Sequence, residues 1–178
     1  MFNNGSNPII INCTFNGNSA RNYGGGLFNN STSSPIVTNC ILWGDRPVEI
    51  FNDYFSFLVV TYSDIQGGWS GTGNIDADPL FVDAVSDNLN LSNGSPCIDT
   101  ADSDALLPTP LSALDFDGKA RYYDVVSMPD TGVGLCTFLD MGACEFQCDC
   151  PQGDINCDGV VDFKDLAIVC NNWLAGVE

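Results

Sequence analysis

The chain has 178 residues, enough for one domain with an appendage, and it carries 23 acidic against 5 basic residues. The resulting net charge of −18 argues against partners such as nucleic acid or anionic lipid and favours divalent cations. Histidine is absent, which excludes histidine-based acid–base catalysis and histidine metal ligation.

The N-terminal third of the chain is built from repeats. Residues 2–15 align with residues 28–42, and residues 51–65 form a weaker third copy. The step from Cys13 to Cys40 is 27 residues and the step from Cys40 to Ser63 is 23 residues. Periods of this size, made of short β-rich runs and turn residues, are typical of a β-solenoid. The glycine run at 24–26 lacks the lysine of a phosphate loop, so it predicts a tight solenoid corner.

The repeated pattern, Pro-x-Ile/Val-x-Asn-Cys-x-Phe/Leu, resembles the right-handed parallel β-helix of pectate-lyase-like and outer-membrane-type proteins. The resemblance implies that Asn12 and Asn39 stack at a corner in the left-handed backbone region, which asparagine tolerates well. Because Phe2 already lies inside a repeat, we expect these coils to be the last three of a longer solenoid. The side chains expected to point inward are Ile10, Val37, Cys13, Cys40, Phe15 and Leu42.

Four later motifs, at residues 74–83, 89–99, 115–121 and 140–145, resemble in this order the C-terminal closing segment of secreted bacterial β-helix proteins, especially those of planctomycete type. The apolar residues expected to cover the last coil are Leu80, Phe81, Leu89, Leu91 and Ile98. For Asp115, Asp117 and Asp140 two interpretations stay open. They bind a second cation, or, as we favour, they cap turns or pair with Arg121.

The C-terminus contains the most specific chemical pattern. Oxygen-bearing side chains fall at positions 1, 3, 5, 9 and 12 counted from Asp154, with Gly159 at position 6. This is the spacing of an EF-type calcium loop, in which position 7 ligates through its backbone carbonyl. An acidic solvated turn is the alternative. The predicted Ca²⁺ ligands are Asp154, Asn156, Asp158, the Val160 carbonyl, Asp162 and Asp165.

Apolar residues at helical spacing follow this loop, so a short amphipathic helix is expected after it. A calcium loop with only its exiting helix resembles one type I dockerin repeat, which implies docking to a cohesin-like or cell-surface protein. Position 12 is Asp165, as in dockerins. Positions 10 and 11, often small hydroxyl residues in dockerins, are Phe163 and Lys164, and the second dockerin repeat is lacking.

Nine cysteines beside a calcium loop predict an extracellular, oxidising location. The first residues do not form a signal peptide, so we expect it to have been lost with a missing N-terminal part. Cys13 and Cys40 are expected to stay reduced inside the coils. Two disulfides are predicted among Cys148, Cys150, Cys157 and Cys170, in either connectivity that avoids a bond between Cys148 and Cys150; a zinc site of four thiolates is the alternative.

The fold class predicted is therefore all-β: a right-handed parallel β-helix of about three coils plus a closing segment, with a small C-terminal EF-type calcium loop and helix. The expected organisation is β-helix coils at 1–92, a closing segment at 93–146, a linker at 147–152 and a dockerin-like half module at 153–178. No apolar stretch approaches the roughly 20 residues of a membrane span.

The function expected is that of a non-catalytic C-terminal part of a secreted or cell-surface protein with a calcium-dependent docking module. One alternative is the tail of a β-helix polysaccharide lyase or hydrolase, for which the coils offer Arg21 and Arg46 as bases and Asp45 and Asp53 as acids. Another is an adhesin. Polysaccharide is a candidate ligand of the β-helix itself.

Overall fold

The computed structural model describes residues 1–106, 114–125, 128–147, 161, 163 and 166. Within these residues the fold is all-β, as predicted, and the helical elements of the described part up to residue 147 are two short 3₁₀ turns. No helix among the described residues is long and apolar enough to cross a membrane.

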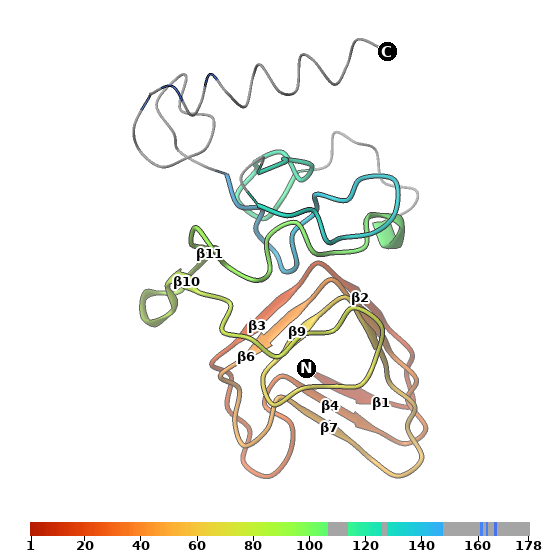
Figure 1. Cartoon of the computed structure of the whole chain (residues 1–178). Coiled ribbons are helices and arrows are strands. Elements are labelled where there is room, and N and C mark those ends of the chain that lie inside the picture. The colour runs from red at the N-terminus through yellow and green to blue at the C-terminus, as the bar shows by residue number, and fades with distance from the viewer. Residues whose placement is uncertain (107–113, 126–127, 148–160, 162, 164–165, 167–178) are drawn as a thin grey trace.

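The chain winds through three parallel sheets, and each turn of the winding contributes one strand to each sheet (Figure 1). The first sheet contains β1 (Phe2–Asn4), β4 (Leu27–Asn30) and β7 (Ile50–Asn52). The second contains β2 (Ile9–Ile11), β5 (Ile36–Thr38) and β8 (Val59–Thr61). The third contains β3 (Thr14–Asn16), β6 (Ile41–Trp43) and β9 (Asp64–Ile65). This arrangement fits a parallel β-helix of three coils.

The strand register follows the sequence repeats. In the first sheet Phe2 pairs with Phe28, which pairs with Phe51. The other two sheets align Ile10 with Val37 and Val60, and Phe15 with Leu42 and Ile65. Even the weaker third copy is therefore in the predicted register, because each coil must place an apolar residue at the same inward position.

The interior of the coils is a stack of small and branched apolar side chains. The side chains that we expected to point inward do so, and Cys13 and Phe15 pack against this core while remaining partly exposed. Each fully buried aliphatic side chain contributes about 1.5–3 kcal/mol relative to an exposed one. The buried members of this core are Ile10, Leu27, Val37, Cys40, Leu42, Ile50, Val60 and Ile65.

The asparagine corner has the predicted backbone but different side-chain bonding. Asn12 and Asn39 have φ angles of 51° and 54°, in the left-handed region. Their amides are not hydrogen-bonded to each other: Asn39 bonds to the backbone of Asp102, whereas Asn12 Oδ1 has no partner. The amide–amide bond lies instead in the first sheet, where Asn3 Nδ2 donates to Asn29 Oδ1 at 2.7 Å. The closing segment folds over the Asn39 corner, and the Asp102 backbone forms hydrogen bonds with the Asn39 side-chain amide.

The glycine run at 24–26 is the tight corner that the sequence predicts. The amides of Gly25 and Gly26 donate to the carbonyls of Val48 and Glu49 in the next coil. A Cβ on Gly25 would lie 2.5 Å from the Arg46 carbonyl oxygen, closer than packed atoms approach. Glycine is required here because the two backbones touch.

The closing segment begins with an antiparallel pair. Strands β10 (Phe81–Asp83) and β11 (Asn88–Leu91) are joined through η1 (Ala84–Ser86), and η2 (Ser103–Leu106) follows. Of the residues predicted to cover the coils, Leu91 and Ile98 are buried and Phe81 packs beside them. The prediction is wrong for Leu80, which has a φ of 52° and is 41% exposed.

The closing segment also lies elsewhere than predicted. It packs against the side of the coils rather than only over the last one, because Ile41 and Trp43 point outward from β6 and need cover. The Ala143 amide donates to Thr14 Oγ1 in the first coil, and the Gly142 amide donates to the Asn39 carbonyl in the second. The last coil is covered at its edge by Ile75, which bonds to Ser63 and Ile65.

Candidate functional site

A cavity of about 970 Å³ lies between the first coil and the closing segment. Cys13 and Thr14 form its floor on the coil side, and Arg121 and Cys144 belong to the closing segment. Asn12, Ala143 and residues 86–90 and 114–117 complete the lining. The cavity exists because the closing segment packs against the coils from the side.

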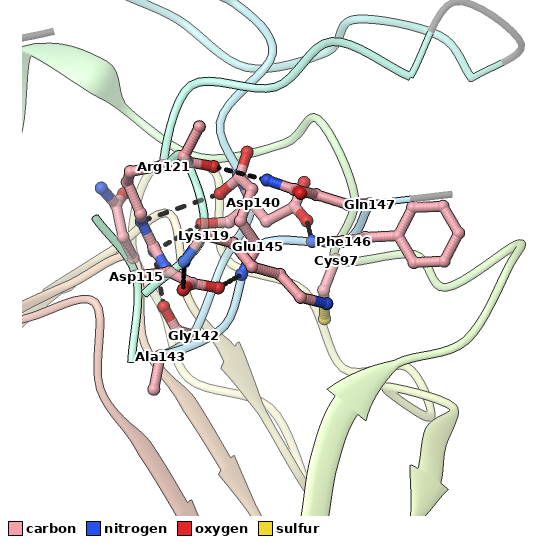
Figure 2. Close-up of polar contacts among 12 residues, drawn as sticks. Cys97, Asp115, Lys119, Arg121, Asp140, Gly142, Ala143, Glu145, Phe146 and Gln147 are labelled. Atoms are coloured by element: carbon pink, nitrogen blue, oxygen red, sulfur yellow. Dashed lines mark hydrogen bonds and ion pairs between the residues drawn. The ribbon is translucent and has the colours of Figure 1, made fainter. Parts of the chain in front are cut away.

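Arg121 is the centre of a buried polar network beside this cavity (Figure 2). One of its terminal nitrogens donates to the carbonyl oxygens of Asp140 and Gly142, at 3.1 Å and 2.6 Å. Its Nε lies 3.7 Å from Glu145 Oε2. Glu145 is therefore the ion-pair partner, a role that the sequence did not assign to it. Arg121 holds the loop from Asp140 to Glu145 in place.

Two of the three aspartates that we considered as a second cation site, Asp115 and Asp140, accept backbone amides, whereas Asp117 Oδ2 accepts from the Asn90 side chain at 2.9 Å. Asp115 accepts hydrogen bonds from the amides of Asp117, Lys119 and Glu145, at 2.9, 2.7 and 2.8 Å. Asp140 accepts from the amides of Asp99 and Phe146, at 2.8 and 2.6 Å.

The buried carboxyls of this network hold a proton more tightly than usual. Burial, followed by the charge of Asp140, raises the pKa of Glu145 to about 10, although Arg121 opposes the change. Burial likewise raises the pKa of Asp140 to about 7. A single guanidinium cannot balance two buried negative charges, so one of these carboxyls stays protonated near neutral pH.

The two thiols of the cavity differ in character. A hydrogen bond with Cys40 and, more weakly, the Arg121 charge lower the pKa of Cys13 to about 7, against the effect of burial. Burial raises the pKa of Cys144 to about 11. Cys13 and Cys40 are both free thiols on neighbouring coils, as expected. Without a histidine anywhere in the chain, the Cys13 thiolate has no imidazole base to work with.

The residues proposed for a lyase or hydrolase lie at two corners of the coils, with Arg21, Arg46 and Asp45 near the glycine run and Asp53 at another corner. Arg21 and Arg46 are exposed, whereas Asp45 is buried and accepts from the backbone amide and side-chain amide of Asn18, at 2.6 and 2.8 Å. Asp53 caps a different corner through the amides of Ser31 and Phe55.

Glu49 is a buried acid that sequence reasoning missed. It lies at the same corner as Asp45, where burial and the Asp45 carboxyl raise its pKa to about 8. The signal that could have identified it is an acid pair four residues apart beside the glycine run, on coils that carry few other charges.

The outer face of the first sheet carries a row of aromatic rings. Phe2, Phe28 and Phe51 occupy the same register position in three successive coils, with ring centroids 5.0 and 5.4 Å apart. Tyr23 packs 4.7 Å from both Phe28 and Phe51. Phe2 is 60% exposed and Tyr23 is 45% exposed. We call these four residues the aromatic row; its signal in the sequence is the phenylalanine that opens each repeat.

One group of acids in the described residues is suited to holding a metal ion. Carboxylate oxygens of Asp99, Asp124 and Asp130 lie within 4.8 Å of one another. Asp99 belongs to a motif noted in the sequence, but its two partners carried no pattern of their own.

The predicted calcium ligands, Asp154, Asn156, Asp158, Val160, Asp162 and Asp165, lie outside the described residues, as do Cys148, Cys150, Cys157 and Cys170. The calcium site and the two disulfides therefore stay predictions. No family model, curated protein or solved structure matches this chain.

Proposed function

We propose that this chain is a non-catalytic, glycan-binding and anchoring part of a secreted or cell-surface protein. A right-handed parallel β-helix presents the aromatic row to a polysaccharide. Residues 153–178 supply a calcium-dependent dockerin-like contact to a cohesin-like or other surface protein. The observation that carries the glycan part is the aromatic row, repeated in register on three coils and open to solvent.

The chemistry of the row suits a sugar polymer. Aromatic rings pack against the C–H faces of sugar rings, and an exposed aromatic surface of this kind marks an interaction site. Asn4 and Asn30 pair two residues further along the same strands and on the same face, so their amides can bond to sugar hydroxyls. Successive coils repeat at about 4.8 Å, which spreads the row along one direction. The net charge of −18 favours a neutral glycan over a polyuronate.

The enzyme alternative has one observation in its favour, the buried acid pair Asp45 and Glu49. Asp45 is enclosed by Asn18 and by the backbone at Gly26, so a substrate has no path to it through the described residues. The adhesin alternative would use the same aromatic face for a protein partner.

The test is co-sedimentation of the calcium-loaded full chain with insoluble cellulose, xylan and mannan. Tyr23→Ser and Phe28→Leu should each weaken binding about three- to tenfold, since an aromatic contact contributes about 0.5–1.5 kcal/mol. Phe28→Leu keeps apolar bulk in the sheet, so that its effect reports the loss of the ring.

Phe116→Ala is the matched control, because Phe116 is 83% exposed but lies in the closing segment. Binding that the two row variants leave unchanged would contradict the glycan proposal. Release of reducing or unsaturated sugar ends from these glycans, pectate or alginate, lost in Asp45→Asn or Glu49→Gln, would establish the enzyme alternative instead.

A further inference from the structure

Asp99, Asp124 and Asp130 form an acidic group that neither the glycan face nor the predicted C-terminal loop uses. Their carboxylate oxygens lie within 4.8 Å of one another although their charges repel. Asp124 and Asp130 are exposed to solvent, whereas the relative exposure of Asp99 is 0%. The group is therefore open to solvent on the side of Asp124 and Asp130 and closed on the side of the buried Asp99.

Asp99 is the unusual member. Both of its carboxylate oxygens are buried and lack a hydrogen-bond partner, whereas Asp140, the other buried aspartate described in the closing segment, accepts two backbone amides. The one ion pair among the described residues joins Arg121 to Glu145, so Asp99 has no ion-pair partner among them. A buried carboxylate without a hydrogen bond or counter-charge is strongly unfavourable unless a cation or proton compensates it.

The backbone fixes this geometry in advance. The Asp99 carbonyl accepts hydrogen bonds from the amides of Thr131 and Gly132, both at 2.9 Å. These bonds place the backbone that follows Asp130 against Asp99. The Asp99 amide donates to Asp140 Oδ1 at 2.8 Å. Thr137 Oγ1 donates to Asp130 Oδ2 at 3.2 Å and orients that carboxylate. Asp99 and Asp130 are therefore held together by bonds that do not involve the Asp99 carboxylate.

We propose that Asp99, Asp124 and Asp130 bind one calcium ion, which joins the segment at Asp99 to the later part of the closing segment. Calcium takes 6–8 oxygen ligands at about 2.3–2.6 Å, and two ligands on opposite sides of the ion are then about 4.6–5.2 Å apart. Water completes the shell on the open side formed by the two exposed acids. Magnesium requires about 2.0–2.1 Å and a near-octahedral shell, in which no two ligands lie more than about 4.2 Å apart, whereas calcium accepts any separation up to the 4.8 Å limit of this group.

Burial and the repulsion between the three carboxylates also affect the pKa of Asp99. Burial, followed by the charges of Asp140, Asp130 and Asp124, raises the pKa of Asp99 to about 7. A bound divalent cation removes the repulsion that a proton would otherwise relieve.

The experiment uses the full chain, stripped of metal with EDTA, in calcium titration calorimetry and thermal denaturation. Asp154→Ala with Asp158→Ala removes the predicted C-terminal loop site and serves as the parent. The parent should retain one saturable calcium site and a calcium-dependent rise in melting temperature. Adding Asp99→Asn should weaken that site at least tenfold and abolish the rise.

The metal-free melting temperature separates ligation from a structural role. Asparagine is isosteric with aspartate and tolerates the φ of 53° at residue 99, so metal-free Asp99→Asn should be at least as stable as its parent. The double variant Asp124→Asn and Asp130→Asn, which changes only exposed acids, should lose the site equally. Asp87→Asn, an exposed acid with a φ of 60° outside the group, should retain it.

A parent that binds no calcium, or binding that survives both sets of substitutions, would overturn the site. Magnesium binding of equal affinity would overturn its assignment to calcium. Neither result depends on glycan co-sedimentation, and loss of calcium from the C-terminal loop is measured separately by comparing wild type with the parent.

Discussion

At the scale of single residues, the acid pair at the glycine corner shows how a coil accommodates buried charge. Glu49 Oε1 accepts a hydrogen bond from the Asp45 amide at 2.9 Å. The other oxygens, Glu49 Oε2 and Asp45 Oδ2, are buried without partners. A proton on Glu49 supplies the hydrogen bond that both oxygens lack, which agrees with its raised pKa of about 8.

We predict that Glu49→Gln stabilises the fold under alkaline conditions. The pKa of Glu49 is higher in the folded chain than in the unfolded chain, so its contribution is complete below pH 4.5 and is lost as the pH rises towards about 8. Glutamine keeps the acceptor and carries a permanent donor. At pH 9 the variant should exceed wild type by a few kcal/mol, on the order of the shift, in urea denaturation.

Near pH 4 the Glu49→Gln variant and wild type should agree closely. Asp53→Asn is the control at another corner, where a hydrogen bond with Ser56 holds the pKa of Asp53 below its usual value, so that this variant gains nothing at alkaline pH. Parallel stability curves for wild type and Glu49→Gln from pH 4 to 9 would contradict a shared proton.

At the scale of elements, the backbone of the closing segment is attached to the coils through a few hydrogen bonds. Asn39 Nδ2 donates to the Asp102 carbonyl at 2.8 Å, and Asn39 Oδ1 accepts from the Asp102 amide at 2.9 Å. Ala143 and Gly142 add bonds to Thr14 and to the Asn39 carbonyl. The corner of the second coil is therefore the principal polar attachment point.

We predict that Asn39→Gly loosens the closing segment without unfolding the coils. Glycine retains the left-handed φ, so the loss reports only the two hydrogen bonds, about 1–3 kcal/mol in total. Hydrogen exchange at the Asp102 and Gly142 amides should accelerate, while the amides of Ile36 and Val59, which bond to the preceding coils, stay protected.

The matched control for Asn39→Gly is Asn12→Gly. Asn12 has the same backbone conformation one coil earlier, and its side-chain oxygen has no hydrogen-bond partner, so this change should leave exchange in the closing segment unaltered. Equal acceleration in both variants would place the attachment elsewhere.

At the scale of the whole molecule, the burial of acidic side chains and the large negative net charge both make the folded chain less stable as the pH rises. Burial is the largest cause that raises the pKa of Asp64 to about 6, of Glu49 to about 8 and of Glu145 to about 10. The folded chain therefore binds more protons than the unfolded chain from about pH 4 upwards. Repulsion within a net charge of −18 adds to the same effect.

We predict that the metal-free chain is most stable in mild acid and loses stability steadily from pH 5 to 9. The sign follows from linkage, because the state that binds more protons is favoured at low pH. Urea denaturation in EDTA at pH 5, 7 and 9 measures it, and salt should recover part of the loss by screening. Stability that rises over this range would show that these carboxyls are not protonated in the folded chain.

The sequence by itself determined the coils. The repeats predicted the register and the inward side chains, and the β-helix resemblance implied the left-handed corner at Asn12 and Asn39; these are confirmed. Each of these features recurs at the same place in successive coils, so a local pattern of apolar residues and turn residues is enough to specify it. The calcium loop is read from spacing in the same way and stays a prediction.

Only the tertiary structure decided how the closing segment packs and which acids meet. Glu145 pairs with Arg121, Glu49 shares a corner with Asp45, and Asp99 faces Asp124 and Asp130. The closing segment occurs once, so no repeat fixes its register, and its contacts join residues that are up to 129 positions apart. Contacts over such separations depend on chain path and burial, which composition and local spacing do not encode.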